Sequence, residues 1–283
     1  MKIVKSATEL EKEITQSKIA GKSIGFVPTM GALHAGHKSL VERAKAENDF
    51  CVVSIFVNPT QFNNKTDLEK YPRNLESDAL LLENIGCDLI FAPASEDIYS
   101  KEEITESFKF DFGGLDQVME GKFRPGHFNG VVQIVSKLFS FVNPDKAYFG
   151  EKDFQQLAII HRMVDILNFK VEIIDCPIIR ETDGLAMSSR NERLSTVNRK
   201  IAVSISKVLF ESRNFANLYS PAELTDWVVA EVNAVQGLEV EYFEIVDAVS
   251  LKKIRDWSKT SVGCIAVFCD DVRLIDNIRY FNN

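Results

Sequence analysis

The chain has 283 residues, a length that corresponds to one large domain or two of modest size. Hydrophobic residues make up 45% and charged residues 26%, so the composition is that of a globular protein and excludes wholesale disorder. The formal net charge is −8, from 33 basic and 41 acidic residues. Such an acidic chain lacks the broad basic surface expected of a dedicated nucleic-acid-binding protein.

Cysteine usage and the first residues bear on the compartment. Five cysteines are scattered along the chain and form no C-x-x-C pair, which favours a reducing compartment over a disulfide framework. The start of the chain, from Met1 to Ser6, lacks the apolar core of a signal peptide. No stretch approaches the ~20 apolar residues of a membrane span. We therefore expect a soluble, cytoplasmic protein.

Short apolar runs alternate with amphipathic helical patterns through the first two-thirds of the chain. The predicted strands are 23–28, 51–57, 88–92, 146–149 and 170–175. The predicted helices are 36–48, 74–85, 128–141 and 153–167. This alternation is typical of a parallel sheet with helices on both faces, and we expect a Rossmann-like, doubly wound α/β domain.

The regular alternation of strand and helix patterns ends after about residue 177. Two helical stretches, 197–214 and 221–235, precede two alternating β-type runs, 238–246 and 262–269, with no long helix between the runs. This pattern predicts a second, smaller α+β domain with antiparallel strands. We expect domains at 1–178 and 179–283, with residues 180–191 as the joint.

The segment P-T-M-G-A-L-H-A-G-H, residues 28–37, joins the first predicted strand to its helix. His34 and His37 are three residues apart, so they project from the same side of the helix entrance. Unpaired amide N–H groups and the positive end of the helix dipole favour a phosphate group here. Small residues such as Gly31 and Gly36 would let a ring or a ribose lie against the backbone. The histidines could also be incidental, or half of a metal site, although no carboxylate or thiol stands at ligand spacing.

The strand followed by H-A-G-H resembles the H-I-G-H signature of the nucleotidylyl-transferring superfamily, which includes the class I aminoacyl-tRNA synthetases. Further segments resemble the pantothenate synthetase family in order and spacing. They are F-V-N-P-T-Q-F (56–62), R-P-G-H-F (124–128), F-G-E-K-D-F-Q-Q (149–156) and M-S-S-R-N (187–191). The resemblance covers nearly the whole chain and implies a homodimeric ligase. Such an enzyme uses ATP and Mg²⁺ to condense pantoate with β-alanine through a pantoyl adenylate, and releases pyrophosphate and AMP.

The resemblance implies a set of ATP-binding residues. They are Met30, Gly31, His34, Gly36, His37, Gly150, Glu151, Lys152, Asp153, Ile179, Met187, Ser188, Ser189 and Arg190. We expect His34, His37, Lys152 and Arg190 to act in catalysis. A carboxylic acid is already ionised at neutral pH, so its attack on the α-phosphate needs in-line positioning and compensation of phosphate charge, not a general base. Lys152 would face the departing pyrophosphate, whereas Asp153 would hold a ribose hydroxyl or cap the following helix.

Residues 187–190 resemble the mobile K-M-S-K-S loop of the same superfamily, with Ala186 before the methionine and Arg190 as the cation. A guanidinium offers a planar fork for bidentate phosphate contact. Because the loop falls at the expected joint, we expect it to close over ATP and exclude water, with the C-terminal domain as a lid. The resemblance also implies backbone contacts from Ile179 to adenine. Without the resemblance, this stretch would suit an ordinary polar linker.

Gln61 and Gln156 are the expected pantoate ligands, because a side-chain amide both donates and accepts hydrogen bonds. Apolar neighbours would line a pocket for the geminal methyl groups, namely Phe56, Val57 and Phe62. Further candidates for the β-alanine and phosphate ends are Asn58, Tyr71, Arg124 and His127. Either glutamine could instead satisfy loop backbone, and His127 could simply start a helix. Asp78 matches a family carboxylate associated with the metal, although Ser77 stands where some members carry a second acid.

Other functions fit parts of the sequence. A simple nucleotidyltransferase would share the helix entrance, but it would require more arginine or lysine for an acceptor phosphate. A synthetase-like tRNA-binding module conflicts with the net charge of −8. A non-catalytic relative would tolerate the loss of His37 and Lys152. No strong general base for the amine step stands in the motifs, so the amine would arrive neutral or lose its proton to water or to the adenylate phosphate.

Overall fold

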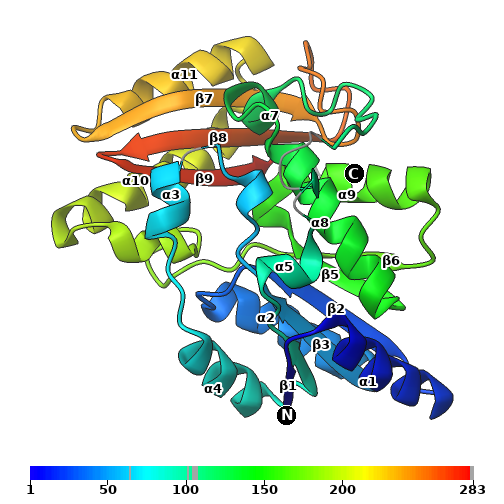
Figure 1. The fold of residues 1–283 in the computed structure, drawn as a ribbon. Coiled ribbons are helices and arrows are strands. Elements are labelled where there is room, and N and C mark those ends of the chain that lie inside the picture. The colour runs from blue at the N-terminus through cyan, green and yellow to red at the C-terminus, as the bar shows by residue number, and fades with distance from the viewer. Residues whose placement is uncertain (64, 101, 104–107, 281–283) are drawn as a thin grey trace. The chain divides into compact units, whose positions relative to one another are not determined.

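The structure, a computed structural model, describes residues 1–63, 65–100, 102–103 and 108–280. The chain divides into two compact units. The first unit comprises Met1–Glu151 and Gln156–Pro177, and the second comprises Lys152–Gln155 and Ile178–Asn283. In Figure 1 the first unit runs from blue to green and the second runs mainly from yellow-green to red.

The first unit is built on a six-stranded sheet in the order β1-β4-β3-β2-β5-β6, and every neighbouring pair is parallel. The strands are β1 (Lys2–Val4), β2 (Ile24–Thr29), β3 (Phe50–Ile55), β4 (Leu89–Phe91), β5 (Lys146–Gly150) and β6 (Glu172–Cys176). From β2 the chain builds outward through β3 and β4, then returns to the other side of β2 for β5 and β6. The strand order therefore reverses between β2 and β5, the place where open α/β sheets bind ligands.

Helices cover both faces of this sheet. The helices of the first unit are α1 (Ala7–Ile19), α2 (Ala35–Glu47), α3 (Lys65–Lys70), α4 (Leu75–Ile85), α5 (Ser95–Ile98), α7 (Met119–Phe123), α8 (His127–Val142) and α9 (Phe154–Leu167), with 3₁₀ turns η1 (Pro59–Gln61) and η2 (Glu151–Asp153). Of these, α1, α8 and α9 pack on one face and α2 and α4 on the other. Side chains alternate along a strand, so Phe26 joins the core beneath α1, α8 and α9 whereas Val27 joins the core beneath α2 and α4. The expected doubly wound α/β architecture is confirmed.

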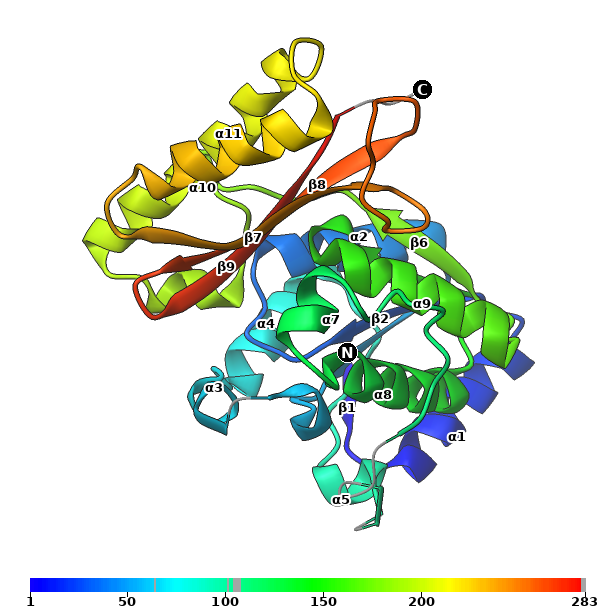
Figure 2. The same cartoon turned by 90° about the horizontal axis from the view of Figure 1, so that it is seen from above.

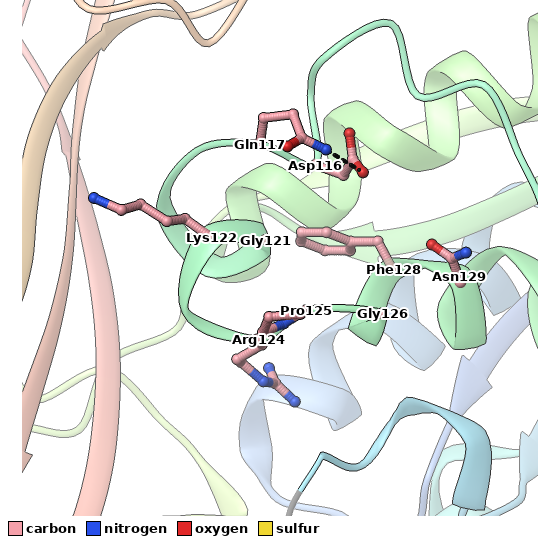
Figure 3. A pocket seen from close by; sticks show the side chains of 9 residues that line it. All are labelled: Asp116, Gln117, Gly121, Lys122, Arg124, Pro125, Gly126, Phe128 and Asn129. Atoms are coloured by element: carbon pink, nitrogen blue, oxygen red, sulfur yellow. Dashed lines mark hydrogen bonds between the residues drawn. The ribbon is translucent and has the colours of Figure 1, made fainter. Parts of the chain in front are cut away.

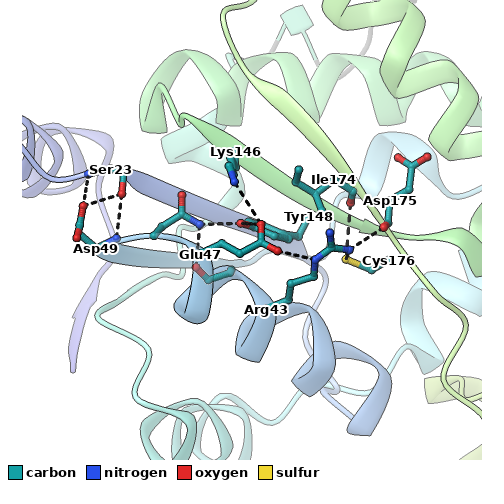
Figure 4. Close-up of polar contacts among 11 residues, drawn as sticks. Ser23, Arg43, Glu47, Asp49, Lys146, Tyr148, Ile174, Asp175 and Cys176 are labelled. Atoms are coloured by element: carbon teal, nitrogen blue, oxygen red, sulfur yellow. Dashed lines mark hydrogen bonds and ion pairs between the residues drawn. The ribbon is translucent and has the colours of Figure 1, made fainter.

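A polar cluster fastens the end of α2 to the sheet, as Figure 4 shows. The Glu47 carboxylate accepts hydrogen bonds from Arg43 Nε at 2.8 Å and from the Tyr148 hydroxyl at 3.0 Å. Tyr148 in turn accepts from Asn48 Nδ2 at 2.7 Å, and Arg43 Nη1 donates to the Asp175 carbonyl at 2.9 Å. These contacts connect α2 with β5 and β6, so the helix that begins at the H-A-G-H segment is held at its far end.

The second unit contains α10 (Thr196–Ser212), α11 (Pro221–Asn233) and an antiparallel sheet in the order β7-β8-β9. The strands are β7 (Leu238–Asp247), β8 (Ser261–Cys269) and β9 (Val272–Arg279), preceded by 3₁₀ turns η3 (Ser189–Arg193) and η4 (Arg213–Phe215). Figure 2 shows α10 and α11 along one face of the sheet, where Leu209 and Val228 meet Ile265 and Val267. The expected smaller α+β domain is thus confirmed in architecture.

Two contacts explain why the Lys152–Gln155 segment belongs to the second unit. Asn277 Nδ2 on β9 donates to the Lys152 carbonyl at 3.1 Å, and the Arg279 guanidinium lies 5.4 Å from the centre of the Phe154 ring. The sequence pattern predicted a single boundary after residue 178 and did not foresee this segment.

No helix among the described residues is long and apolar enough to cross a membrane.

Candidate active site

The two histidines of the H-A-G-H segment cap α2 reciprocally. His34 is the N-cap residue, and its Nδ1 accepts the Gly36 amide at 3.1 Å, while Nδ1 of His37 accepts the His34 amide at 3.4 Å. The ring centres are 4.1 Å apart and the planes are tilted by 39°. Because Nδ1 accepts in each ring, the neutral imidazoles carry their protons on Nε2. The helix entrance thus presents two neighbouring Nε2–H groups that can donate to an anion.

The backbone amides of the preceding loop are engaged within the protein. The Gly31 amide donates to Thr29 Oγ1 at 3.2 Å, and the amides of Ala32 and Leu33 donate to the Asp78 carboxylate at 3.0 and 2.8 Å. The loop turns through left-handed backbone at Gly31 (φ +80°) and Ala32 (φ +51°). The expectation of unpaired amide N–H groups is therefore wrong for these three residues, because a buried carboxylate and a hydroxyl accept their hydrogen bonds. The imidazoles remain the donors suited to phosphate.

Asp78 lies on α4 with only 3% of its surface exposed. Burial raises the pKa of this carboxyl, and the two amide hydrogen bonds partly oppose that shift. Each carboxylate oxygen already accepts an amide, and the described residues contain no group of three or more His, Cys, Asp or Glu side chains that could hold a metal ion. The Asp78 carboxylate therefore holds the loop, and its association with Mg²⁺ stays a prediction.

Several of the predicted substrate residues lie together beside the loop. Gln61 Nε2 donates to Met30 Sδ at 3.1 Å, and the backbone carbonyl oxygen of Gln61 lies 2.8 Å from His127 Nδ1 at the start of α8. Asn58 Nδ2 donates to Gln61 Oε1 at 3.1 Å. Gln61, Asn58 and His127 are all buried. The structure thus brings Met30, Asn58, Gln61 and His127 together near the carboxyl ends of β2 and β3.

Three other residues predicted for the substrate site differ in their surroundings. Tyr71 is buried, and its ring packs edge-on against Phe62, with centroids 5.7 Å apart. Phe56 is buried in the main core of the first unit, so it lies beneath the surface instead of lining an open pocket. Gln156 is half-buried in the first turn of α9.

Arg124 borders a cavity of about 280 Å³ in the first unit. Its Nη1 lies 3.3 Å from Glu120 Oε2, so an acid already compensates part of its charge. Figure 3 shows the Phe128 ring near the middle of the lining and the hydrogen-bonded Asp116–Gln117 pair above it. The cavity is lined by Asp116, Gln117, Gly121, Lys122, Arg124, Pro125, Gly126, Phe128 and Asn129.

The G-E-K-D segment begins where β5 ends at Gly150. Gly150 has no atom within 4 Å of the position that a Cβ would take. Lys152 has a side chain that is 18% exposed, with Nζ 3.9 Å from Oδ2 of the half-exposed Asp153. The Lys152 backbone is held by Asn277, a residue that sequence reasoning missed. No local motif marks Asn277, because it stands 125 positions away and meets Lys152 only in the folded unit.

Residues 179–187 form a hairpin in the second unit, at the start of the segment predicted as the joint. The Met187 amide donates to the Ile179 carbonyl at 3.0 Å, so that carbonyl is already engaged. The Arg180 guanidinium donates two hydrogen bonds, of 2.6 and 2.9 Å, to the Asp276 carboxylate on β9. Ser188 Oγ accepts the Arg190 amide at 3.2 Å and caps η3, which also contains Ser189. These contacts attach the segment to the body of the second unit.

Comparison with known proteins is consistent along the whole chain. The profile of the family described as Pantoate-beta-alanine ligase matches residues 2–279. A pantothenate synthetase of Phocaeicola vulgatus is 58% identical over 283 residues, covering 99% of each chain. A crystal structure of pantothenate synthetase from Thermus thermophilus shares 42% identity with a TM-score of 0.92 and covers 100% of both chains.

A further solved relative was determined with ligands. It is the pantoate-beta-alanine ligase of Francisella tularensis, whose structure is described as complexed with beta-gamma ATP and beta-alanine. It shares 36% identity with a TM-score of 0.82 and covers 100% of this chain and 99% of its own. With a full-length profile match and relatives above half identity, the chain belongs to the pantoate–β-alanine ligase family.

Proposed function

We propose that this chain joins pantoate to β-alanine in two steps at the expense of ATP. A pantoate carboxylate oxygen attacks the α-phosphorus, the bond to the β-phosphate breaks, and pyrophosphate leaves. The β-alanine nitrogen then attacks the carbonyl of the mixed anhydride, the bond to AMP breaks, and the amine loses a proton. The family membership and a relative whose structure is described as complexed with beta-gamma ATP and beta-alanine support this assignment.

The observation that carries the proposal is the reciprocal capping of α2 by His34 and His37. With Nδ1 of each ring occupied by a backbone amide, each neutral ring can donate from Nε2. Such donors at a helix N-terminus favour the oxygens of a triphosphate. Fixed donors aimed at developing charge cost no reorganisation during the reaction, and one such donor is worth roughly 3–4 kcal/mol. We assign the α-phosphate to this pair.

For the remaining phosphate groups we assign Lys152 and Arg190. Lys152 carries an ammonium group on a backbone that Asn277 fixes, and Arg190 follows the serine that caps η3. An ammonium suits a point contact with the departing pyrophosphate, and a guanidinium suits bidentate contact. Adenine and ribose contacts are assigned to Met30, Gly31, Gly36, Gly150, Glu151, Asp153, Ile179, Met187, Ser188 and Ser189 by the family resemblance.

Pantoate is assigned to Gln61 and Gln156. The Gln61 amide donates to a thioether sulfur, which is a weak acceptor, so an oxygen of the hydroxy acid would replace it with a gain in hydrogen-bond strength. Arg124 is assigned to the β-alanine carboxylate, since it supplies a guanidinium that borders a cavity. Tyr71 and His127 are assigned to the walls of the substrate site.

The test is pantoate-dependent exchange of labelled pyrophosphate into ATP, followed by AMP formation when β-alanine is added. We expect both activities in the wild-type protein. In the His37→Ala variant we expect the rate of pyrophosphate exchange to fall by about 100-fold or more. AMP transfer to a phosphate acceptor without pantoate would favour the simple nucleotidyltransferase. Absence of both pantoate-dependent activities would overturn the proposed ligase.

We also propose that the chain acts as a homodimer in the cytoplasm. The family resemblance supports the dimer, and five buried free thiols suit a reducing compartment. Sedimentation equilibrium of the purified protein tests the dimer. A single species with a mass near the 31.9 kDa of one chain would contradict it.

A further inference from the structure

Asn58 has every hydrogen-bonding position of its side chain occupied by the protein. Its Oδ1 accepts from the Tyr99 hydroxyl at 2.9 Å and from Thr60 Oγ1 at 3.1 Å. Its Nδ2 donates to Gln61 Oε1 at 3.1 Å and to the Gly130 carbonyl at 3.0 Å. A primary amide can accept two hydrogen bonds and donate two. Asn58 is only 1% exposed, so it has neither the surface nor the capacity to contact a substrate directly.

The two hydroxyl groups fix which way the Asn58 amide points. Tyr99 is 4% exposed, and burial raises its pKa to about 12, so its hydroxyl is protonated at neutral pH. A hydroxyl that has its proton available donates to Oδ1, which turns Nδ2 toward Gln61. The alternative orientation would place the Asn58 NH₂ group against the two hydroxyls and its oxygen against two carbonyl-type oxygens.

Asn58 in turn fixes the amide of Gln61. Because Gln61 Oε1 accepts from Asn58, Gln61 Nε2 is directed to the sulfur of Met30, in the loop that leads to α2. The backbone beneath cannot shift easily, since a Cβ on Gly130 would lie 2.5 Å from the Thr60 carbonyl oxygen. Because α8 and η1 approach so closely, the Gln61 backbone is held and only its side-chain amide could rotate. The hydrogen bonds to Oε1 and from Nε2 of Gln61 prevent that rotation.

We propose that Tyr99 is a positioning residue that acts through Asn58 to fix the donor side of the Gln61 amide toward the hydroxy-acid substrate. The inference rests on the proposed function, which assigns Gln61 to pantoate. It also changes the role of Asn58, predicted as a substrate contact, to that of the link between Tyr99 and Gln61.

The experiment measures pantoate affinity by calorimetry and the pantoate KM in pyrophosphate exchange. We expect Tyr99→Phe to weaken pantoate about five- to tenfold while the KM for ATP changes less than about twofold, since one neutral hydrogen bond is removed. The matched control is Tyr148→Phe, which removes another buried tyrosine hydroxyl with two polar partners in the same unit. We expect this control to leave pantoate affinity unchanged.

A double-mutant cycle separates positioning from general destabilisation. If Tyr99 acts through Gln61, Tyr99→Phe adds no further loss in the Gln61→Ala background, whereas independent effects would multiply. Multiplying effects, or equal losses in the Tyr99 and Tyr148 variants, would overturn the inference alone. Wild-type protein that binds no pantoate would overturn the proposed function, and this inference with it.

Discussion

Asp78 Oδ1 accepts the backbone N–H of Leu33 at 2.8 Å, across 45 positions of sequence. The second oxygen accepts the amide of Ala32, whose left-handed φ of +51° is unusual for a residue with a side chain. A Cβ on Gly31 would lie 2.9 Å from the same carboxylate, so the loop and the acid are fitted closely together. One buried acid therefore shapes the turn that delivers His34 and His37.

Replacing this acid tests its role directly. We expect Asp78→Asn to lower the free energy of unfolding by about 1–3 kcal/mol, because one loop amide then faces an NH₂ group. The displaced loop should raise the KM for ATP, while the Mg²⁺ concentration that gives half-maximal pyrophosphate exchange stays unchanged. Urea denaturation and Mg²⁺ titrations measure these effects.

The control for Asp78 is Glu76→Gln, which removes an exposed charge from the same helix. We expect it to leave both stability and ATP affinity near wild type. A marked rise in the Mg²⁺ requirement of Asp78→Asn, with ATP affinity and stability intact, would instead identify Asp78 as a metal ligand.

Gly130 gives a second prediction. A methyl group there would meet the Thr60 carbonyl oxygen at 2.5 Å and the Gln61 amide nitrogen at 2.6 Å, both of them backbone atoms. We expect Gly130→Ala to destabilise the protein by about 1–3 kcal/mol and to raise the KM for pantoate more than the KM for ATP. Ser136→Ala, on the same helix, is the control. Equal effects on the two substrates would show that η1 does not position pantoate ligands.

His161 and Asp175 give a pH prediction. His161 Nε2 lies 2.9 Å from Asp175 Oδ1, and this hydrogen bond raises the pKa of the histidine. A raised folded-state pKa means that the charged pair adds stability below the unfolded value near 6.5, and that this stability is lost as pH rises through the folded value. Both side chains are more than 40% exposed, at 48% and 42%, so solvent screens the pair. We expect it to contribute about 0.2–1 kcal/mol.

Urea midpoints of wild type and His161→Gln, compared at pH 5.5 and pH 9, measure that contribution. The difference between the two proteins should be larger at pH 5.5. In an Asp175→Asn background the pH dependence of the difference should vanish. A larger difference at pH 9 would contradict the pairing.

Periodicity predicted much of the fold, and the residues that escaped it share a physical cause. The strands and helices that apolar spacing predicted have bounds within two residues of the observed ones, whereas β1 and α1 at the start of the chain were not predicted. Strand β9 was missed because its inward-facing row, Val272, Leu274, Asp276 and Ile278, contains a charged residue, which pairs with Arg180 far away in sequence.

In the candidate site, too, local sequence patterns do not reveal partners that are distant along the chain. The motifs identified residue types at the helix entrance, but no pattern along the chain reveals that Asp78 occupies the loop amides or that Tyr99 orients Asn58. Such partners are chosen by tertiary packing. The motifs therefore predicted the candidate substrate-binding residues, whereas the residues that hold them in place emerged only in the folded chain.

The buried pair between Arg180 and Asp276 gives the last prediction. Two hydrogen bonds join them, and the side chains are only 17% and 4% exposed. Removing one partner of a buried ion pair leaves the other charge uncompensated, so we expect Asp276→Asn to destabilise the second unit by about 3 kcal/mol or more. Both tryptophans, Trp227 and Trp257, belong to this unit, and their fluorescence during urea denaturation reports its unfolding.

Asp276 also connects to the proposed phosphate site, because Oδ1 accepts the Asn277 amide at 2.7 Å and Asn277 Nδ2 donates to the Lys152 carbonyl. We therefore expect Asp276→Asn to raise the KM for ATP as well as to shift the tryptophan transition to lower urea. Asp271→Asn is the matched control, since its 72% exposed side chain pairs with Arg193 at 3.7 Å. If both variants unfold at the wild-type urea midpoint, the pair does not stabilise the unit, since an uncompensated buried guanidinium could not leave the transition in place.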